Sequence, residues 1–266
     1  MSKVIRVLLL FVAVLILTIF LNIQVPTNIP LDKQPPAEIL SNDFLLGDYY
    51  FNHGPFADGT YDLSLARKHY ASALAYNPVG DNIAWYQLGR IDFLEGKFDD
   101  ALTKFAKQVK YFNVQEPSVY YMIGLTNGYK ARKGLGDVAD DWKQAENNFI
   151  EYLRLNPDSP WGRVDLSWVY FSQGDFKKML PILEEGLASN PTNPWLLNMY
   201  GLAVLNSSSA KDGATTYFEK ALQEANNLTE DDWGKSYPGN DPKGWGSGLE
   251  EFKNVIKQNL LVSQRS

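Results

Sequence analysis

The chain has 266 residues, a net charge of −6 and no cysteine, and 45% of its residues are hydrophobic. Without cysteine there is no disulfide bond, no thiolate nucleophile and no cysteine-ligated zinc or iron–sulfur site. Lys3 and Arg6 contribute +2 to the first 24 residues, so the rest of the chain carries −8. An acidic domain of this kind is a poor partner for nucleic acid.

The first predicted element is a membrane-spanning helix. Residues 4–21 are apolar except for Arg6 and Thr18, and these 18 residues span about 27 Å as a helix, close to a hydrocarbon core. A cleaved signal peptide is the alternative, but the sequence after Leu21 lacks the small-residue pattern of a cleavage site. We therefore predict an uncleaved anchor over residues 1–24. Its positive N-terminal flank predicts a cytoplasmic N-terminus and an extracytoplasmic remainder.

An extended linker is predicted over residues 25–39. This stretch contains Pro26, Pro30, Pro35 and Pro36, and proline fixes φ and removes a backbone donor. Such a spacer holds the next domain a short distance from the bilayer.

The clearest repeated unit consists of two predicted helices separated by a turn with glycine. A glycine in the first helix allows close approach of the second, whose alanine lies where the helices cross and whose aromatic residue fills the space one turn on. The residues concerned are Trp85, Leu88, Gly89, Gly96, Phe98, Ala101 and Phe105. This unit resembles the tetratricopeptide repeat (TPR). Asp92 stands where the family has tyrosine, and Asn113 where it has proline.

Four further segments match the same pattern in part, which predicts a TPR domain of about five repeats over residues 40–228. Three second helices end in Asn-Pro, at Asn77, Asn156 and Asn190. Asparagine tolerates a left-handed conformation at a helix end, and proline then blocks continuation.

Two features depart from the family pattern. The fourth repeat has Ser167 and Met179 where the others have glycine and alanine, so its helices are expected to sit wider apart. The turns at 53–62 and 131–141 are longer than the family's and are expected to be surface loops, either neutral insertions or contact loops beside a binding surface.

The tail at 229–266 is predicted to be a loop followed by a capping helix that covers the last repeat. The helix begins near Ser247, and its apolar residues recur at helical spacing: Leu249, Phe252, Val255, Ile256 and Leu260. The Tyr237–Pro242 segment lies between Trp233 and Trp245. It is either an ordered loop held by these aromatics or a loop that contacts a ligand.

The resemblance implies an all-α fold: a right-handed superhelical solenoid of TPR helix pairs with a C-terminal capping helix, preceded by one transmembrane helix. No phosphate-binding loop, dinucleotide fingerprint or nucleophile-elbow motif occurs in the sequence. Its two histidines, His53 and His69, do not have metal-ligand spacing. We therefore predict a protein that is not an enzyme, with no catalytic residue, metal or cofactor.

Family resemblance implies that the first helices of the pairs line a concave face that binds peptides or protein segments. The residues assigned to this face form an aromatic groove with one cation: Phe44, Phe51, Tyr86, Arg90, Phe93, Tyr121, Tyr129, Trp161, Trp168 and Phe171. About half of them are expected to pack instead against neighbouring repeats or the tail helix. The prediction is a membrane-anchored scaffold for protein–protein interactions at the extracytoplasmic face of a bacterial cytoplasmic membrane. The alternative is an accessory protein that binds envelope glycan or assists polysaccharide assembly through the same aromatics.

Overall fold

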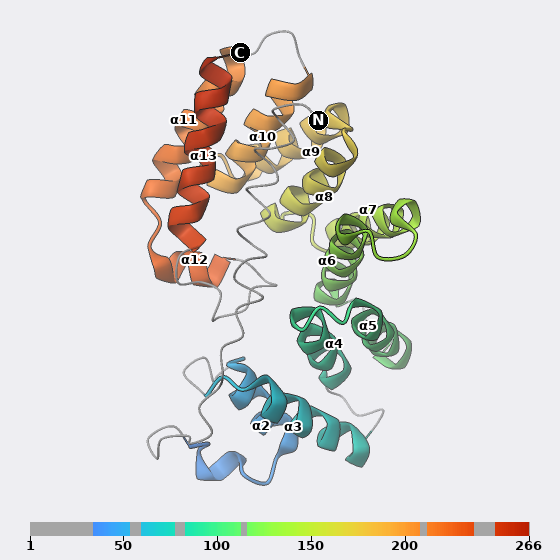
Figure 1. The fold of residues 1–266 in the computed structure, drawn as a ribbon. Coiled ribbons are helices and arrows are strands. Elements are labelled where there is room, and N and C mark those ends of the chain that lie inside the picture. The colour runs from blue at the N-terminus through green and yellow to red at the C-terminus, as the bar shows by residue number, and fades with distance from the viewer. Residues whose placement is uncertain are drawn as a thin grey trace. The chain divides into compact units, whose positions relative to one another are not determined.

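The computed structural model describes residues 34–53, 60–77, 83–112, 116–207, 212–236 and 248–265. Every regular element in these ranges is a helix (Figure 1). The described residues up to Met122 form one compact unit, and those from Ile123 onward form another. The predicted anchor at residues 4–21 and the Tyr237–Pro242 loop lie outside the described ranges. Inside them, no helix is long and apolar enough to cross a bilayer.

The unit that ends at Met122 contains antiparallel helix pairs. Its elements are the 3-10 helix η2 (Ala37–Ile39) and the helices α2 (Asp43–Phe51), α3 (Leu63–Tyr76), α4 (Ala84–Leu94), α5 (Phe98–Phe112) and the first part of α6 (Pro117–Lys133). α2 packs on α3, and α4 packs on both α3 and α5. The predicted linker is therefore not extended to its end, because Pro36 precedes η2 and Ile39 is buried.

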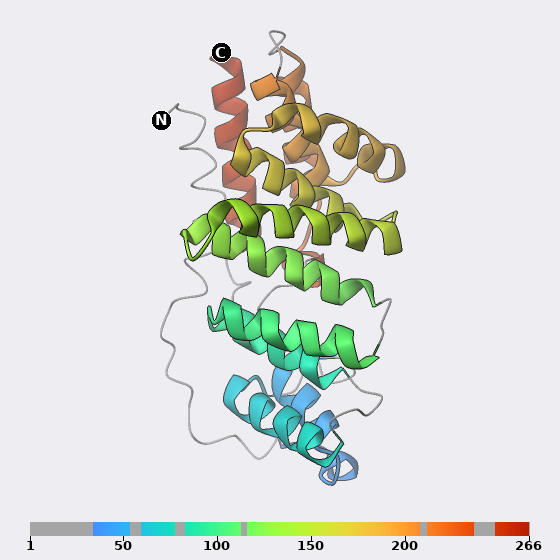
Figure 2. The same cartoon turned by 90° about the vertical axis from the view of Figure 1, so that its right-hand side faces the viewer.

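The unit that begins at Ile123 continues the same alternation of paired helices (Figure 2). It contains the rest of α6, followed by α7 (Val138–Leu155), α8 (Pro160–Gln173), α9 (Phe176–Ser189), α10 (Pro194–Ser207), α11 (Asp212–Asn226), α12 (Glu230–Ser236) and α13 (Gly248–Gln264). Sequential contacts run from α7 through α8, α9 and α10 to α11.

Polar side chains define where these helices begin. The caps accept hydrogen bonds from the backbone N–H groups of the first turn, which otherwise lack helical partners. They are Asn42, Asp62, Asp137, Ser159 and Asn193. Proline then occupies the first position of α6, α8 and α10, where its missing N–H costs nothing.

The predicted Asn-Pro helix ends are present, but their conformation was predicted wrongly. Asn77, Asn156 and Asn190 follow α3, α7 and α9 with φ between −141° and −135° and positive ψ, not in the left-handed region. A following proline disfavours helical backbone and favours extended angles at the residue before it. Each asparagine still donates its N–H to the last turn of the helix.

The long loop predicted at 131–141 is mostly helical. α6 runs to Lys133 and α7 begins at Val138, so the turn is short. Gly134 and Gly136 adopt φ values of 68° and 93°, which favour glycine and make the tight turn accessible. Part of the other predicted loop, at 53–62, lies outside the described ranges.

Glycine and a buried aromatic ring meet at the crossing of four helix pairs. A Cβ added to Gly47, Gly89, Gly124 or Gly201 would lie 2.5–3.0 Å from the ring of Tyr70, Phe105, Phe149 or Phe218, respectively. The alanine one turn before each ring is completely buried. In the pair of α8 and α9, Ser167, Met179 and Leu183 are also completely buried. The same crossing is therefore filled by larger residues at the glycine and alanine positions and by a smaller residue at the aromatic position.

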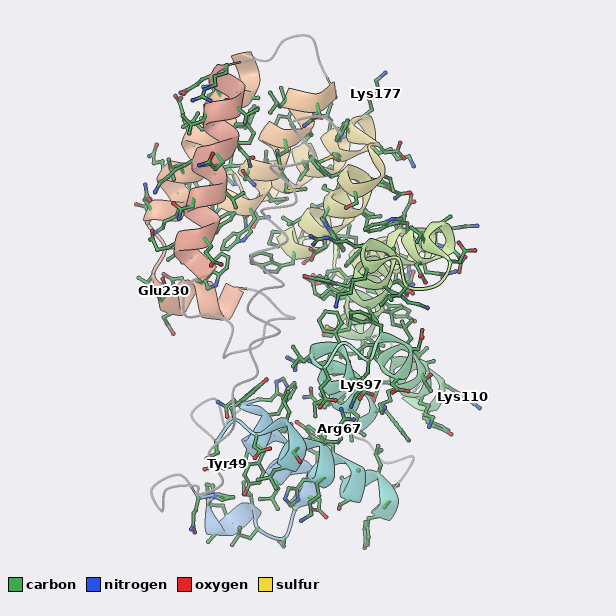
Figure 3. The ribbon with its side chains drawn as sticks, in the orientation of Figure 1. Tyr49, Arg67, Lys97, Lys110, Lys177 and Glu230 are labelled. Atoms are coloured by element: carbon green, nitrogen blue, oxygen red, sulfur yellow. The ribbon has the colours of Figure 1, made fainter. Side chains whose placement is uncertain are left out.

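Asp92, which replaces the family's tyrosine, joins three helices. Its carboxylate is 1% exposed and accepts from Arg67 of α3 at 2.7 Å and from Lys104 of α5. Glu95 binds both Arg67 and Lys97, and Figure 3 shows these two cations close together. A buried carboxylate with two cationic donors satisfies the need to pair a buried charge.

The pair of α7 and α8 uses an equivalent contact with different chemistry. Tyr170 stands three residues after Ser167, as Asp92 stands three after Gly89, and its hydroxyl donates to Glu146 at 2.8 Å. Glu146 follows the buried Ala145, as Arg67 follows the buried Ala66. The same pair of positions therefore holds Arg–Asp in one place and Glu–Tyr in another.

α13 closes the end of the described array. It packs on α11 and α10 and buries Leu249, Phe252, Val255 and Ile256, as the apolar spacing predicts. Asn259 of α13 donates to Asn198 of α10 at 2.9 Å in a buried position. The last helix pair is thus covered as repeat arrays require.

Candidate functional site

Seven of the ten residues predicted to line an exposed aromatic groove are buried. They are Phe51, Tyr86, Phe93 and Tyr121 in one unit, and Tyr129, Trp168 and Phe171 in the other. Phe44, Arg90 and Trp161 are half-buried. The prediction of exposure was therefore wrong for most of the set, because first-helix aromatics pack against neighbouring helices. Their assignment as partner contacts stays a prediction that now depends mainly on the three half-buried side chains.

The structure brings together three of the predicted residues, Phe51, Tyr86 and Arg90, with Arg90 at the centre. Its guanidinium carbon lies 4.7 Å from the ring centroid of Phe51 and 5.8 Å from that of Tyr86. Its Nη1 donates to Gln87 at 3.0 Å and lies 3.4 Å from His53 Nδ1. These contacts join α2 and α4 and hold a cation against aromatic faces, an arrangement that restricts the side chain without neutralising it.

Asp48 and Tyr70 form the buried part of the Arg90 cluster. The Tyr70 hydroxyl donates to Asp48 Oδ1 at 2.6 Å. Burial raises the pKa of Asp48 to about 6, although Tyr70 and Arg90 both favour its charged form. Burial, and secondarily the nearby Arg90 charge, lowers the pKa of His53 to about 4. At neutral pH the cluster therefore contains a charged arginine, a neutral histidine and a carboxylate.

The two shifted groups predict opposite dependences of stability on pH. The unfolded chain protonates His53 at its ordinary pKa of 6.5, before the folded chain does, so His53 lowers stability as pH falls from 6.5 to 4. The folded chain protonates Asp48 near pH 6, before the unfolded chain does at 3.8, so Asp48 raises stability over that range. The two contributions nearly cancel in the unmodified protein.

Replacing either Asp48 or His53 is expected to expose the pH dependence of stability that the other residue contributes. Relative to wild type, Asp48→Asn should lose stability on acidification and His53→Gln should gain it, each by about 2 kcal/mol once partial exposure is allowed for. Urea unfolding measured between pH 6.5 and 4 tests this. Parallel pH profiles for the two variants would show that the pair does not titrate as described.

In the unit from Ile123 onward, Tyr129 and Trp168 also meet. Their ring centroids are 5.6 Å apart, and Trp142 lies 5.4 Å from Trp168 in an edge-to-face arrangement. Gly128 permits this contact, because a Cβ there would lie 2.5 Å from the Trp168 ring. Burial raises the pKa of the Tyr129 hydroxyl, which keeps it neutral. This cluster is packing between α6, α7 and α8.

A second aromatic cluster, around Trp195, was not found from the sequence. Trp195 stacks on Phe252 at 5.0 Å and on Trp233 at 5.6 Å, and meets Trp161 edge-on at 4.8 Å. Trp161 and Trp195 both follow the proline that begins a first helix, and this repeated Pro-Trp was the available signal. Trp161 and Trp233 remain half-buried, so the cluster reaches the surface.

The described part of the chain contains no group of three acidic or histidine side chains placed to hold a metal ion. Its polar clusters pair acids with hydroxyl or cationic donors, as at Asp48, Asp92 and Glu146.

No family model and no curated protein matches the chain. Solved structures do match. MamA aligns with a TM-score of 0.55 and 21% identity over 76% of this chain and 98% of that one. A thermophilic TPR protein of Thermus thermophilus, TTC0263, aligns at 0.52 and 22% identity, over 70% and 91%. YrrB, described as a TPR protein with an unusual peptide-binding site, aligns at 0.51 and 16% identity, over 70% and 90%.

These similarities show the fold. Where the structure describes it, the chain is all-helical and has the fold of TPR proteins, as the glycine, alanine and aromatic positions of its helix pairs predicted.

Proposed function

We propose that this protein is a non-enzymatic scaffold that binds segments of other proteins. The observation that carries the proposal is the series of paired helices with the TPR fold, an architecture whose first helices present a recognition surface. YrrB, which shares the fold, is described as having a peptide-binding site. Half-buried aromatic and arginine side chains are the residue types that dominate binding energy at such surfaces.

We further propose that residues 4–21 anchor the scaffold in a bacterial cytoplasmic membrane, with the helix pairs on the extracytoplasmic side. The support is the run of 18 residues that is apolar except for Arg6 and Thr18, with Lys3 before it and Arg6 close to its N-terminal end. A tethered scaffold needs only modest affinity for each segment, because confinement to the bilayer raises the effective concentration of partners in the same membrane.

An accessory protein for envelope glycan is the second candidate. It is favoured by the Trp195 cluster, in which Trp161 and Trp233 keep part of their rings at the surface. Aromatic faces can stack on sugar rings. This candidate predicts retention of isolated polysaccharide in the absence of any protein.

Crosslinking in the membrane, followed by mass spectrometry, tests the scaffold. Arg90→Ala combined with Trp161→Ala removes two half-buried side chains of the first helices and is expected to lower capture of specific partners about 30-fold. Ile150→Ala with Arg154→Ala, on the exposed face of α7, is the matched control and should capture the same partners as wild type. Circular dichroism checks that both variants fold.

Equal capture by both double variants would contradict binding through the first helices. Loss of capture in the α7 control alone would move the binding surface to the second helices. Failure to capture any protein, together with retention of envelope polysaccharide, would favour the glycan accessory.

A further inference from the structure

One edge of the unit that ends at Met122 collects its exposed hydrophobic side chains. Among the described residues of this unit, the large hydrophobic side chains that are strongly exposed are Leu40 at 59%, Tyr76 at 94% and Tyr111 at 41%. They precede α2, end α3 and lie in the last turn of α5, respectively. Side chains so far apart in sequence share an edge only if the topology places them there.

Antiparallel packing does place them together. Asp43 at the start of α2 contacts His69, midway along α3, at 2.7 Å. At the opposite ends of the two helices, Asp62, the cap of α3, donates its N–H to Tyr50 near the end of α2, at 2.8 Å. Tyr86 at the start of α4 donates its N–H to Gln108 near the end of α5, at 2.9 Å. Arg67 near the start of α3 binds Glu95, which follows α4. The beginnings of α2 and α4 and the ends of α3 and α5 therefore lie at one edge.

Lysine and tryptophan complete this edge. Lys107 lies with its Nζ 4.2 Å above the Trp85 ring, and Lys110 with its Nζ 5.7 Å from the Tyr111 ring. Figure 3 shows Lys110 extending outward from α5. No acid occurs between Ala101 and Phe112 in the sequence. We name the set Leu40, Tyr76, Trp85, Lys107, Lys110 and Tyr111 the tether edge.

The chain also enters the unit at the tether edge, since α2 begins there. Only residues 22–33 separate the predicted anchor from the first described residue, and they reach at most roughly 40 Å. The part of the unit nearest the attachment point is thus the part that carries two exposed tyrosines, the exposed Lys110, and the half-buried Trp85 and Lys107. These are the residue types that lie at membrane–water interfaces, with rings at headgroup level and ammonium groups against anionic lipid.

We propose that the tether edge rests on the anionic lipid surface of the bilayer that holds residues 4–21, and so fixes which face of this unit points away from the membrane. The inference rests on the anchor in the proposed function. Lys107 and Lys110 supply the attraction to phosphate headgroups, while Tyr76 and Tyr111 insert at the interface. Glu38 and Glu116 lie near the same helix ends and offset part of the lysine charge.

The test uses full-length protein in vesicles of phosphatidylcholine, with or without phosphatidylglycerol. Because the chain lacks cysteine, an introduced cysteine can carry an environment-sensitive fluorophore at a single site. Ala75→Cys places it beside Tyr76, and Ser64→Cys places it at the other end of α3, roughly 16 Å away. Both positions are exposed. Vesicle flotation measures anchoring separately from the label.

The expected result is flotation of both labelled proteins, with an apolar shift of the label at 75, strongest with phosphatidylglycerol, and none at 64. Lys107→Gln with Lys110→Gln should lower the engaged population roughly five-fold, because each lysine near an anionic surface contributes a modest free energy that salt partly screens. Lys97→Gln, at the opposite edge, should leave the label at 75 unchanged.

Flotation with identical signals at 75 and 64 would overturn the tether edge while leaving the anchor intact. A shift at 75 that appears only when a membrane protein is added to the vesicles would also overturn it, and would assign the edge to a protein partner. Failure to float would refute the anchor, and the tether edge with it.

Discussion

Asp92→Asn is expected to lower the free energy of unfolding by about 3 kcal/mol, because it leaves the Arg67 and Lys104 charges without their shared carboxylate. The value is placed at the low end of the range for buried ion pairs, since both cations are partly exposed and can reach water. Urea denaturation of the full-length protein in mild detergent, followed by circular dichroism, measures the change.

Glu95→Gln is the matched control for Asp92. It removes a carboxylate that binds the same Arg67 but is itself partly exposed, so the expected loss is below about 1 kcal/mol. Equal losses for the two variants would mean that burial of Asp92 adds nothing to the interaction. An Asp92→Asn protein as stable as wild type would show that α3, α4 and α5 do not depend on this carboxylate.

Phe218→Ala is expected to cost about 3–5 kcal/mol. The ring is completely buried where α10 crosses α11, and its removal leaves a cavity that rigid neighbouring helices cannot close. The same measurement of urea unfolding applies. A loss below about 1 kcal/mol would indicate that the crossing collapses around the smaller side chain.

A pair of glycine variants separates packing from helix propensity at the same crossing. Gly201→Ala places a Cβ 2.6 Å from the Phe218 ring, so overpacking of about 1–3 kcal/mol opposes the propensity gain of about 1 kcal/mol. Gly213→Ala, in the first turn of α11, meets nothing closer than 3.7 Å and is expected to be neutral or slightly stabilising. Stabilisation by both would contradict the close approach of α10 and α11.

The helix pairs could be predicted because their signals are local. The spacing from Gly89 to Phe105 is set by one hairpin, and the apolar period of α13 needs only one helix. Asn77 shows the limit of this reasoning: its position as a helix end was right, but the following proline gave it extended rather than left-handed backbone.

The candidate site was less predictable because burial depends on which helices become neighbours. Tyr86 and Phe93 are on the predicted helix but are covered by its neighbours. The Arg90 cluster draws Asp48, His53 and Tyr70 from other parts of the chain, and no spacing in the sequence links these residues. Trp195 and Trp233 are in contact, although the whole of α11 lies between them in the sequence.

The two forms of the contact beside the buried alanine have a consequence for how such an array could be rearranged. A chimera that placed α7 ahead of α4 would bring the Glu146 carboxylate to the Asp92 carboxylate, and the reverse exchange would set Arg67 against the Tyr170 hydroxyl. Like charges held together at low exposure are strongly unfavourable. The repeats of this chain share one backbone arrangement, but the side chains at this contact match only the neighbour that is present, so exchanging helices between repeats would place mismatched groups together.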